Sequence, residues 1–147
     1  MLVADIMTAN PITVTLDDSL RTAIEHMRHY NCRRLPVVNN DGALVGIITD
    51  HDTRLALHSP FVLREEGHDD GLLDSVKVRQ CMTPAPITAE PGMDIATAIS
   101  LMLTHKIGGL PVLRGESVVG IVTSTDVMAA FARYLKLENT ESTTTRR

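Results

Sequence analysis

An internal repeat constrains this 147-residue chain more than any other feature of its sequence. The segment Gly-Ile-Ile-Thr-Asp-His-Asp at 46–52 returns as Gly-Ile-Val-Thr-Ser-Thr-Asp at 120–126. Met-Thr at 7–8 returns at 82–83, an offset of 82 − 7 = 75 positions. At this offset two more segments match, Pro-Ile-Thr at 11–13 and 86–88 and Leu-Pro-Val at 35–37 and 110–112. Such self-similarity indicates two copies of one supersecondary unit.

Each copy is predicted to form a β-α-β-β-α unit, from its hydrophobic spacing and its cap and turn residues. In the first copy we expect, in order, a strand at 12–14, a helix capped by Asp17, Asp18 or Ser19, strands at 35–38 and 44–49 joined by a turn at 39–42, and a helix at 50–58. In the second copy Asp94 should cap the first helix, and the last helix should span 124–135. One copy leaves a sheet face uncovered. The two should therefore pack about a pseudo-two-fold axis in a mixed α/β (α+β) fold.

The repeat also predicts the domain organisation. We expect a first repeat at 1–58, a linker at 59–77, a second repeat at 78–137 and a disordered tail, rich in Thr, Ser and charge, at 138–147. The linker reads as a polar surface loop with a short helix near 72–76. His58, His68 and Asp69 could be imagined there as metal ligands, but their irregular spacing favours a solvated linker.

The end of the repeated motif, Thr-x-x-Asp, has two interpretations. A threonine or aspartate at a helix start can simply cap the helix by accepting hydrogen bonds from unpaired N–H groups. Alternatively, a hydroxyl and a carboxylate three residues apart can hold a vicinal diol, because a carboxylate accepts two hydroxyl protons. The motif occurs at the same place in both repeats, as Thr49 with Asp52 and as Thr123 with Asp126. This recurrence favours the diol-binding interpretation.

Composition excludes several classes of function. The net charge is −4, with no clustered basic stripe, which argues against nucleic acid as a partner. No apolar run approaches the length of a membrane span, and the N-terminus lacks the features of a secretory signal, so we expect a cytoplasmic protein with no membrane partner. Cys32 and Cys81 align with isoleucines, which favours small core residues over a disulfide or a metal site. No P-loop, nucleophile elbow or pair of metal-spaced histidines occurs, so we expect no enzyme, no catalytic cofactor and no metal.

The duplicated, ordered set Pro-Ile-Thr, Leu-Pro-Val and Gly-Ile-(Ile/Val)-Thr-x-x-Asp resembles a tandem pair of CBS (cystathionine-β-synthase-type) domains. The resemblance covers nearly the whole chain except the linker and the tail. It implies two β-α-β-β-α repeats joined through their sheets, with two clefts between them. It also implies a regulatory ligand, often AMP, ADP or ATP and sometimes S-adenosylmethionine or a dinucleotide.

The resemblance further implies which residues would contact such a ligand. The aspartate of the motif holds the ribose hydroxyls, and the threonine lines the sugar or phosphate side. Backbone groups on the opening strand of the opposite repeat contact the base. The implied contacts are Thr49, Asp52 and Ile87 in one cleft, and Thr123, Asp126 and Ile12 in the other.

The two repeats differ just before Leu-Pro-Val, a place that commonly carries basic phosphate contacts in the family. It holds Arg33 and Arg34 in the first repeat but Gly108 and Gly109 in the second. Taken alone, the arginines could be a solvated pair at a helix C-terminus. The glycines could form a plain turn or let a ligand approach the backbone. The asymmetry predicts that the Asp52 cleft holds phosphate more tightly than the other cleft.

These features predict a non-catalytic regulatory module that binds an adenine nucleotide between its repeats and signals by a shape change to a partner protein. The alternative is a structural or protein-interaction module with vestigial clefts, and a weaker one is divalent-metal sensing through the acidic linker. The resemblance implies a homodimer formed through the helices, and the last helix of each repeat does carry much apolar surface for so small a pair. The residues concerned are Leu55, Leu57, Met128, Phe131 and Leu135.

Overall fold

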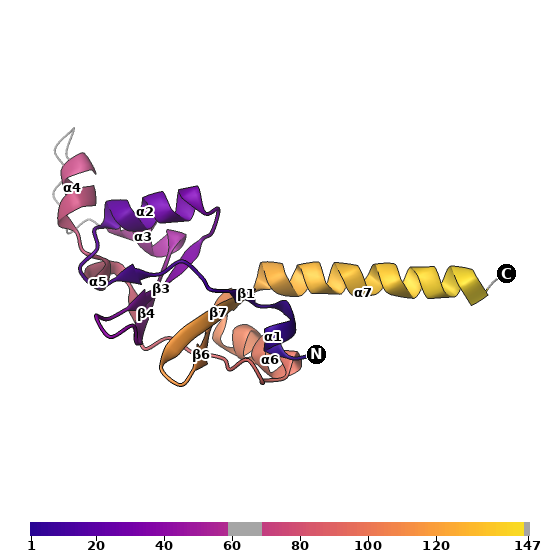
Figure 1. Cartoon of the computed structure of the whole chain (residues 1–147). Coiled ribbons are helices and arrows are strands. Elements are labelled where there is room, and N and C mark those ends of the chain that lie inside the picture. The colour runs from indigo at the N-terminus through magenta and orange to yellow at the C-terminus, as the bar shows by residue number, and fades with distance from the viewer. Residues whose placement is uncertain (59–68, 146–147) are drawn as a thin grey trace.

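The computed structural model describes residues 1–58 and 69–145 as two small sheets with helices packed on them (Figure 1). In the first half the elements are α1 (Val3–Ile6), β1 (Thr8–Ala9), β2 (Val14–Thr15), α2 (Leu20–His29), β3 (Arg34–Val38), β4 (Leu44–Thr49) and α3 (Asp50–Leu57). In the second half they are α4 (Asp69–Ser75), α5 (Val78–Cys81), β5 (Thr83–Pro84), α6 (Ile95–His105), β6 (Gly109–Arg114), β7 (Ser117–Thr123) and α7 (Ser124–Thr145).

The opening segment of each repeat pairs with the sheet of the other repeat. One sheet has the order β2-β3-β4-β5, and the other has the order β1-β7-β6. Strand β5 of the second repeat pairs antiparallel with β4 of the first, with Pro84 opposite Gly46. Strand β1 of the first repeat pairs antiparallel with β7 of the second, with Ala9 opposite Gly120. The two repeats are therefore interlocked about a pseudo-two-fold axis.

The hydrophobic cores show the same exchange. Val3, from α1 of the first repeat, lies fully buried in the core of the second repeat. Val78, from α5 of the second repeat, lies fully buried in the core of the first. Each core is thus completed by the opening segment of the other repeat, and neither repeat has a complete core without its neighbour.

The glycine that opens each repeated motif is required by this pairing. A Cβ atom on Gly46 would lie 2.5 Å from Met82 Sδ and 3.0 Å from the carbonyl oxygen of Thr83. A Cβ atom on Gly120 would lie 2.5 Å from Met7 Sδ. The close backbone approach at this glycine is therefore to the exchanged segment of the other repeat.

Most predicted elements are present, and the caps are resolved. The strands predicted at 35–38 and 44–49 are β3 and β4. Ser19 caps α2 by accepting from Thr22 N at 3.1 Å, and Asp94 caps α6 by accepting from Ala96 N at 2.8 Å. The opening strand differs from the predicted 12–14: β2 is Val14–Thr15, because only these residues lie beside β3 in parallel register.

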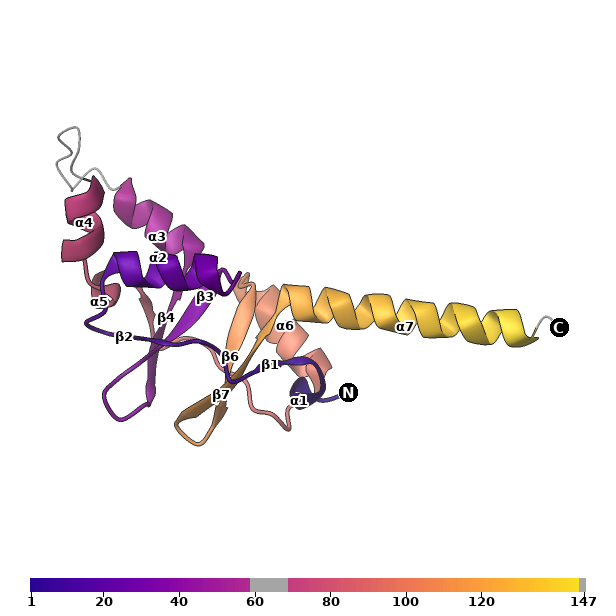
Figure 2. The ribbon, with the colours of Figure 1, turned by 45° about the horizontal axis from the view of Figure 1, so that its top comes forward.

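The predicted disordered tail is helical as far as Thr145, since α7 continues through most of it. The residues from Phe131 to Thr143 are all exposed, so local bonds rather than a core hold this segment. Tyr134 Oη donates to Glu138 Oε1 at 2.6 Å, one turn further along the helix. Figure 2 shows the helix extending away from the two sheets. Residues 146–147 lie outside the described part of the chain.

The linker also differs from its prediction. Its helix, α4, starts at Asp69 rather than near residue 72, and an ion pair between Arg21 and Asp74, at 2.7 Å, joins it to α2. Residues 59–68, among them His68 of the imagined metal trio, lie outside the described residues. Within the described ranges no group of three His, Cys, Asp or Glu side chains is placed to hold a metal ion. None of the described helices is both long and apolar enough to cross a bilayer.

We predict that Gly46→Ala lowers the free energy of unfolding by about 1–3 kcal/mol, because the new methyl group overpacks against Met82 and the Thr83 carbonyl. Gly120→Ala should cost a similar amount. Gly92→Ala is the matched control, since a Cβ there meets nothing within 4 Å. Urea denaturation of the three variants measures the effect. Equal stability of the Gly46 and Gly92 variants would contradict the proposed close approach.

Candidate functional site

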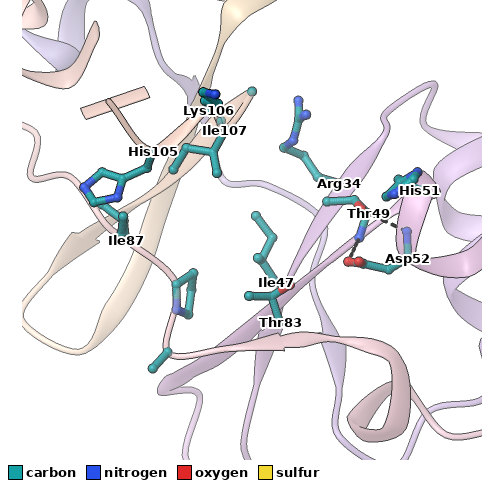
Figure 3. Close-up of a pocket in the computed structure, with 14 residues that line it drawn as sticks. Arg34, Ile47, Thr49, His51, Asp52, Thr83, Ile87, His105, Lys106 and Ile107 are labelled. Atoms are coloured by element: carbon teal, nitrogen blue, oxygen red, sulfur yellow. Dashed lines mark hydrogen bonds between the residues drawn. The ribbon is translucent and has the colours of Figure 1, made fainter. Parts of the chain in front are cut away.

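A cavity of about 490 Å³ lies between the two repeats. Figure 3 shows its walls, with the start of α3 and the strand before it on one side and the end of α6 on the other. The first repeat contributes Arg34, Ile47, Thr49, His51 and Asp52. The second repeat contributes Thr83, Ala85, Pro86, Ile87, His105, Lys106, Ile107, Gly108 and Gly109. The site therefore exists only where the repeats meet.

The cavity gathers six of the ten candidate site residues named from the sequence. They are Arg34, Thr49, Asp52, Ile87, Gly108 and Gly109. In particular, Ile87 lies in the same cavity as Asp52 although it belongs to the other repeat.

The remaining four implied residues lie elsewhere. Arg33 lines a separate hollow of about 280 Å³ beside Asp50 and Thr53. Ile12 packs half-buried against the core of the first repeat. Thr123 and Asp126 form the second copy of the motif and do not line this cavity.

The repeated motif does cap both helices. Thr49 Oγ1 accepts from Asp52 N at 3.1 Å, and Asp52 Oδ2 accepts from Thr49 N at 2.9 Å, which makes a reciprocal capping box. The capping interpretation of the motif is therefore confirmed, and diol binding would have to occur in addition to it. The cap uses only one carboxylate oxygen, and within the described residues nothing donates to Asp52 Oδ1. That oxygen remains available to a ligand in the cavity.

The second copy of the motif is more fully occupied. Asp126 Oδ2 accepts from Thr123 N at 2.8 Å and from Thr123 Oγ1 at 3.0 Å. Its other oxygen, Oδ1, accepts from Thr8 Oγ1 at 3.3 Å. Both oxygens of Asp126 have protein partners, so the two aspartates are not equivalent as ligand acceptors.

The glycine pair makes room for Arg34 across the pseudo-two-fold axis. A Cβ atom on Gly108 would lie 2.5 Å from Arg34 Nη2, and one on Gly109 would lie 2.8 Å from Arg34 Cδ. Gly109 is the repeat equivalent of Arg34. Near the axis the Arg34 side chain therefore fills the space that any side chain at position 109 would need. The sequence left the role of the glycines open, and this packing accounts for it.

Arg34 is a partly buried cation. Burial lowers the pKa of its guanidinium, the nearby Asp50 carboxylate opposes that shift, and Arg33 adds to it. In the described part of the chain no group accepts a hydrogen bond from this guanidinium. A half-buried charge of this kind gains from an anionic partner.

The sequence analysis missed the contribution of the end of α6. Lys106 is the C-cap of this helix, in the left-handed conformation with φ 54°, and it lines the cavity with His105. His51, from the first turn of α3, lines the opposite wall. A difference between the repeats could have indicated Lys106. This residue aligns with Asn31, so the second repeat has a cation where the first has an amide.

Comparison with known proteins shows that the chain belongs to the CBS domain family. The family model matches residues 3–59 and again residues 78–133. A CBS domain-containing protein of Dictyostelium discoideum is 38% identical over 139 residues, an alignment that covers 92% of this chain and 94% of that protein.

Two solved structures are similar over nearly their whole length. The CBS domain pair of protein MJ0100, solved with 5′-methylthioadenosine and S-adenosyl-L-methionine, has a TM-score of 0.78 and 31% identity, covering 91% of this chain and 98% of that one. CBSX2, a CBS-pair protein of Arabidopsis thaliana solved with AMP, has a TM-score of 0.74 and 26% identity, covering 90% and 97%. The tandem pair predicted from sequence is confirmed.

We predict that Asp52→Ala lowers the free energy of unfolding of the unliganded protein by about 1 kcal/mol, because it removes one arm of the capping box. Asp52→Asn retains a side-chain oxygen for the Thr49 N–H and should lose less. Asp41→Ala, at an exposed turn position, is the control and should change stability by less than about 0.5 kcal/mol. Chemical denaturation without ligand tests this, and an Asp52→Ala variant as stable as the parent would contradict the cap.

Proposed function

We propose that the protein is a non-catalytic regulatory module that binds an adenosine-containing ligand in the cavity between its repeats. The single observation that carries the proposal is the cavity itself. Around one space it places a carboxylate with one oxygen that accepts from no described residue, an apolar segment of the other repeat, and an arginine with no acceptor among the described residues.

Each group suits one part of such a ligand. The open oxygen of Asp52 can accept the hydroxyl protons of a ribose, and Thr49 lies beside it. Ile47 and Ile87 offer apolar walls to a flat base, and the backbone at Ile87 can hydrogen-bond its edge. Arg34 offers a planar donor group to a phosphate.

The relatives support the same class of ligand. MJ0100 was solved with 5′-methylthioadenosine and S-adenosyl-L-methionine, and CBSX2 was solved with AMP. The shared fold and family make an adenosyl group the natural expectation here. Because the cavity is built from both repeats, ligand occupancy can alter how they sit together, and we propose that a partner protein reads this change.

The cysteines support a reducing, cytoplasmic setting for this module. Cys32 and Cys81 are free thiols packed half-buried against the first core. Burial raises the pKa of both thiols. Free cysteines used as core residues are typical of a reducing compartment.

We predict that adenosine, AMP, ATP or S-adenosylmethionine raises the melting temperature. A ligand present at 100 times its dissociation constant should raise the free energy of unfolding by about 2.7 kcal/mol. Calorimetric titration should then show that Asp52→Asn weakens binding about tenfold or more, because the ribose loses its charged acceptor. Asp126→Asn is the matched control and should have a smaller effect, since its carboxylate is already occupied. Equal losses would contradict the assignment of the site, and no shift with any of the ligands would favour the structural alternative.

A second candidate function, self-association, is supported by the exposed apolar side chains of α3 and α7. Leu55 is 57% exposed, Met128 63%, Phe131 59% and Leu135 44%. Leu57, also expected on this surface, instead packs against the first core. An apolar surface of this kind indicates an interface. We propose a homodimer, formed whether or not the cavity is occupied.

Light scattering at tens of micromolar should therefore give the mass of a dimer. Met128→Glu places a charge in the apolar face and should shift the equilibrium to monomer. Ser142→Glu adds the same charge on the same helix beyond its apolar residues and should leave the dimer intact. A clean monomer for the parent chain would refute the dimer.

A further inference from the structure

The charges around the cavity are unevenly distributed. Arg34 and Lys106 are cations, Asp52 is the single carboxylate among the lining residues, and the other titratable groups there are His51 and His105. Arg34 comes from the first repeat and Lys106 from the second, so cationic groups stand on both walls (Figure 3).

The one carboxylate is already partly compensated. Asp52 lies in the first turn of α3 and accepts from Thr49 N, so part of its charge is matched by the positive end of the helix dipole. The lining residues therefore carry two cations against one carboxylate, and the Asp50 carboxylate, outside the lining, lies near enough to Arg34 to oppose the lowering of its pKa. Arg34 is also a half-buried guanidinium with no acceptor among the described residues.

Lys106 occupies a backbone position that lysine does not favour. Its φ of 54° and ψ of 47° are left-handed, a conformation that glycine and asparagine adopt most readily at helix ends. The first repeat has Asn31 at the equivalent position, with φ 50°. A cation does suit the C-terminal dipole of α6. Its location on the cavity wall adds a second reason for a lysine here, since strained residues concentrate at functional sites.

We propose that this cavity selects a phosphate-bearing adenosyl ligand over a sulfonium-bearing one, and that Lys106 is the specificity-determining partner of Arg34. The inference rests on the proposed function. A phosphate group would lie between the two cations, with Arg34 contributing paired donors and Lys106 a point charge. S-adenosylmethionine carries a sulfonium and an ammonium group against a single carboxylate, so it is a net cation and would be repelled by Arg34 and Lys106.

The test is calorimetric titration with four ligands that share the adenosyl group: the neutral adenosine and 5′-methylthioadenosine, the anion AMP and the net cation S-adenosylmethionine. AMP should bind the parent protein about tenfold or more tightly than adenosine, as one charged contact allows. S-adenosylmethionine should bind more weakly than neutral 5′-methylthioadenosine. Raising the salt concentration should weaken AMP binding and leave adenosine nearly unchanged.

The variants separate charge recognition from folding. Lys106→Asn restores the residue type of the first repeat, keeps the left-handed turn and removes the charge. It should weaken AMP about tenfold and change adenosine less than about twofold. Arg34→Gln should act in the same direction. Lys136→Asn, on the exposed outer part of α7, changes net charge equally and should change nothing.

Three outcomes are decisive. S-adenosylmethionine binding as tightly as AMP would overturn the charge selection while leaving the adenosyl site standing. An equal loss of adenosine and AMP in Lys106→Asn would overturn the role of Lys106, because a purely structural lysine would affect both. Failure of all four ligands to bind the parent protein would overturn the proposed function and this inference together.

Discussion

The reciprocal exchange of opening segments is the interaction on which the rest of this structure depends. Strand β1 crosses to β7, strand β5 crosses to β4, and a methionine covers a glycine at each crossing. Because each core contains a fully buried valine from the other repeat, the two cores should form together. The crossing also carries the chain from β5 directly into Ala85, Pro86 and Ile87, one wall of the cavity. Folding and site assembly are thus one event.

Symmetry that builds the scaffold is broken where the two halves meet. At a pseudo-two-fold axis, equivalent residues face each other, and close packing leaves room for only one long side chain. Arg34 takes that space and Gly109 yields it, with the backbone of Gly108 also under the guanidinium. This packing places the arginine in the Asp52 cavity. No inserted loop is needed to bring a positive charge there. The same divergence extends to Asp126, whose second oxygen accepts from Thr8, whereas the second oxygen of Asp52 accepts from no described residue.

Sequence reasoning gave the repeat, both hairpins and the caps because these depend on local spacing and on residue chemistry that one strand or helix expresses by itself. It also paired Ile87 with Asp52 through the family resemblance. It could not give the exchange of β1 and β5, since two-residue strands carry almost no periodicity. It could not place Lys106, whose approach to the site depends on how α6 ends relative to the other repeat. The helical tail was missed because its polar composition resembles disorder and its stabilising bonds, such as Tyr134 to Glu138, are local.

The double use of Asp52 suggests how occupancy of the cavity could reach the surface. The carboxylate that faces the cavity also closes the first turn of α3, so a ligand that draws on Asp52 acts on the helix that carries it. The outer side of that short helix presents Leu55. Thr49, the last residue of β4, is hydrogen-bonded to the first turn of the helix through Asp52. In the second repeat the corresponding carboxylate is tied to Thr8 on the exchanged strand, so α7 is held by protein contacts instead. A ligand can shift the equilibrium between two conformations only by the difference in its affinity for them. On this geometry that difference would act on α3, whose first turn Asp52 closes, rather than on α7, whose Asp126 is already bonded to Thr8.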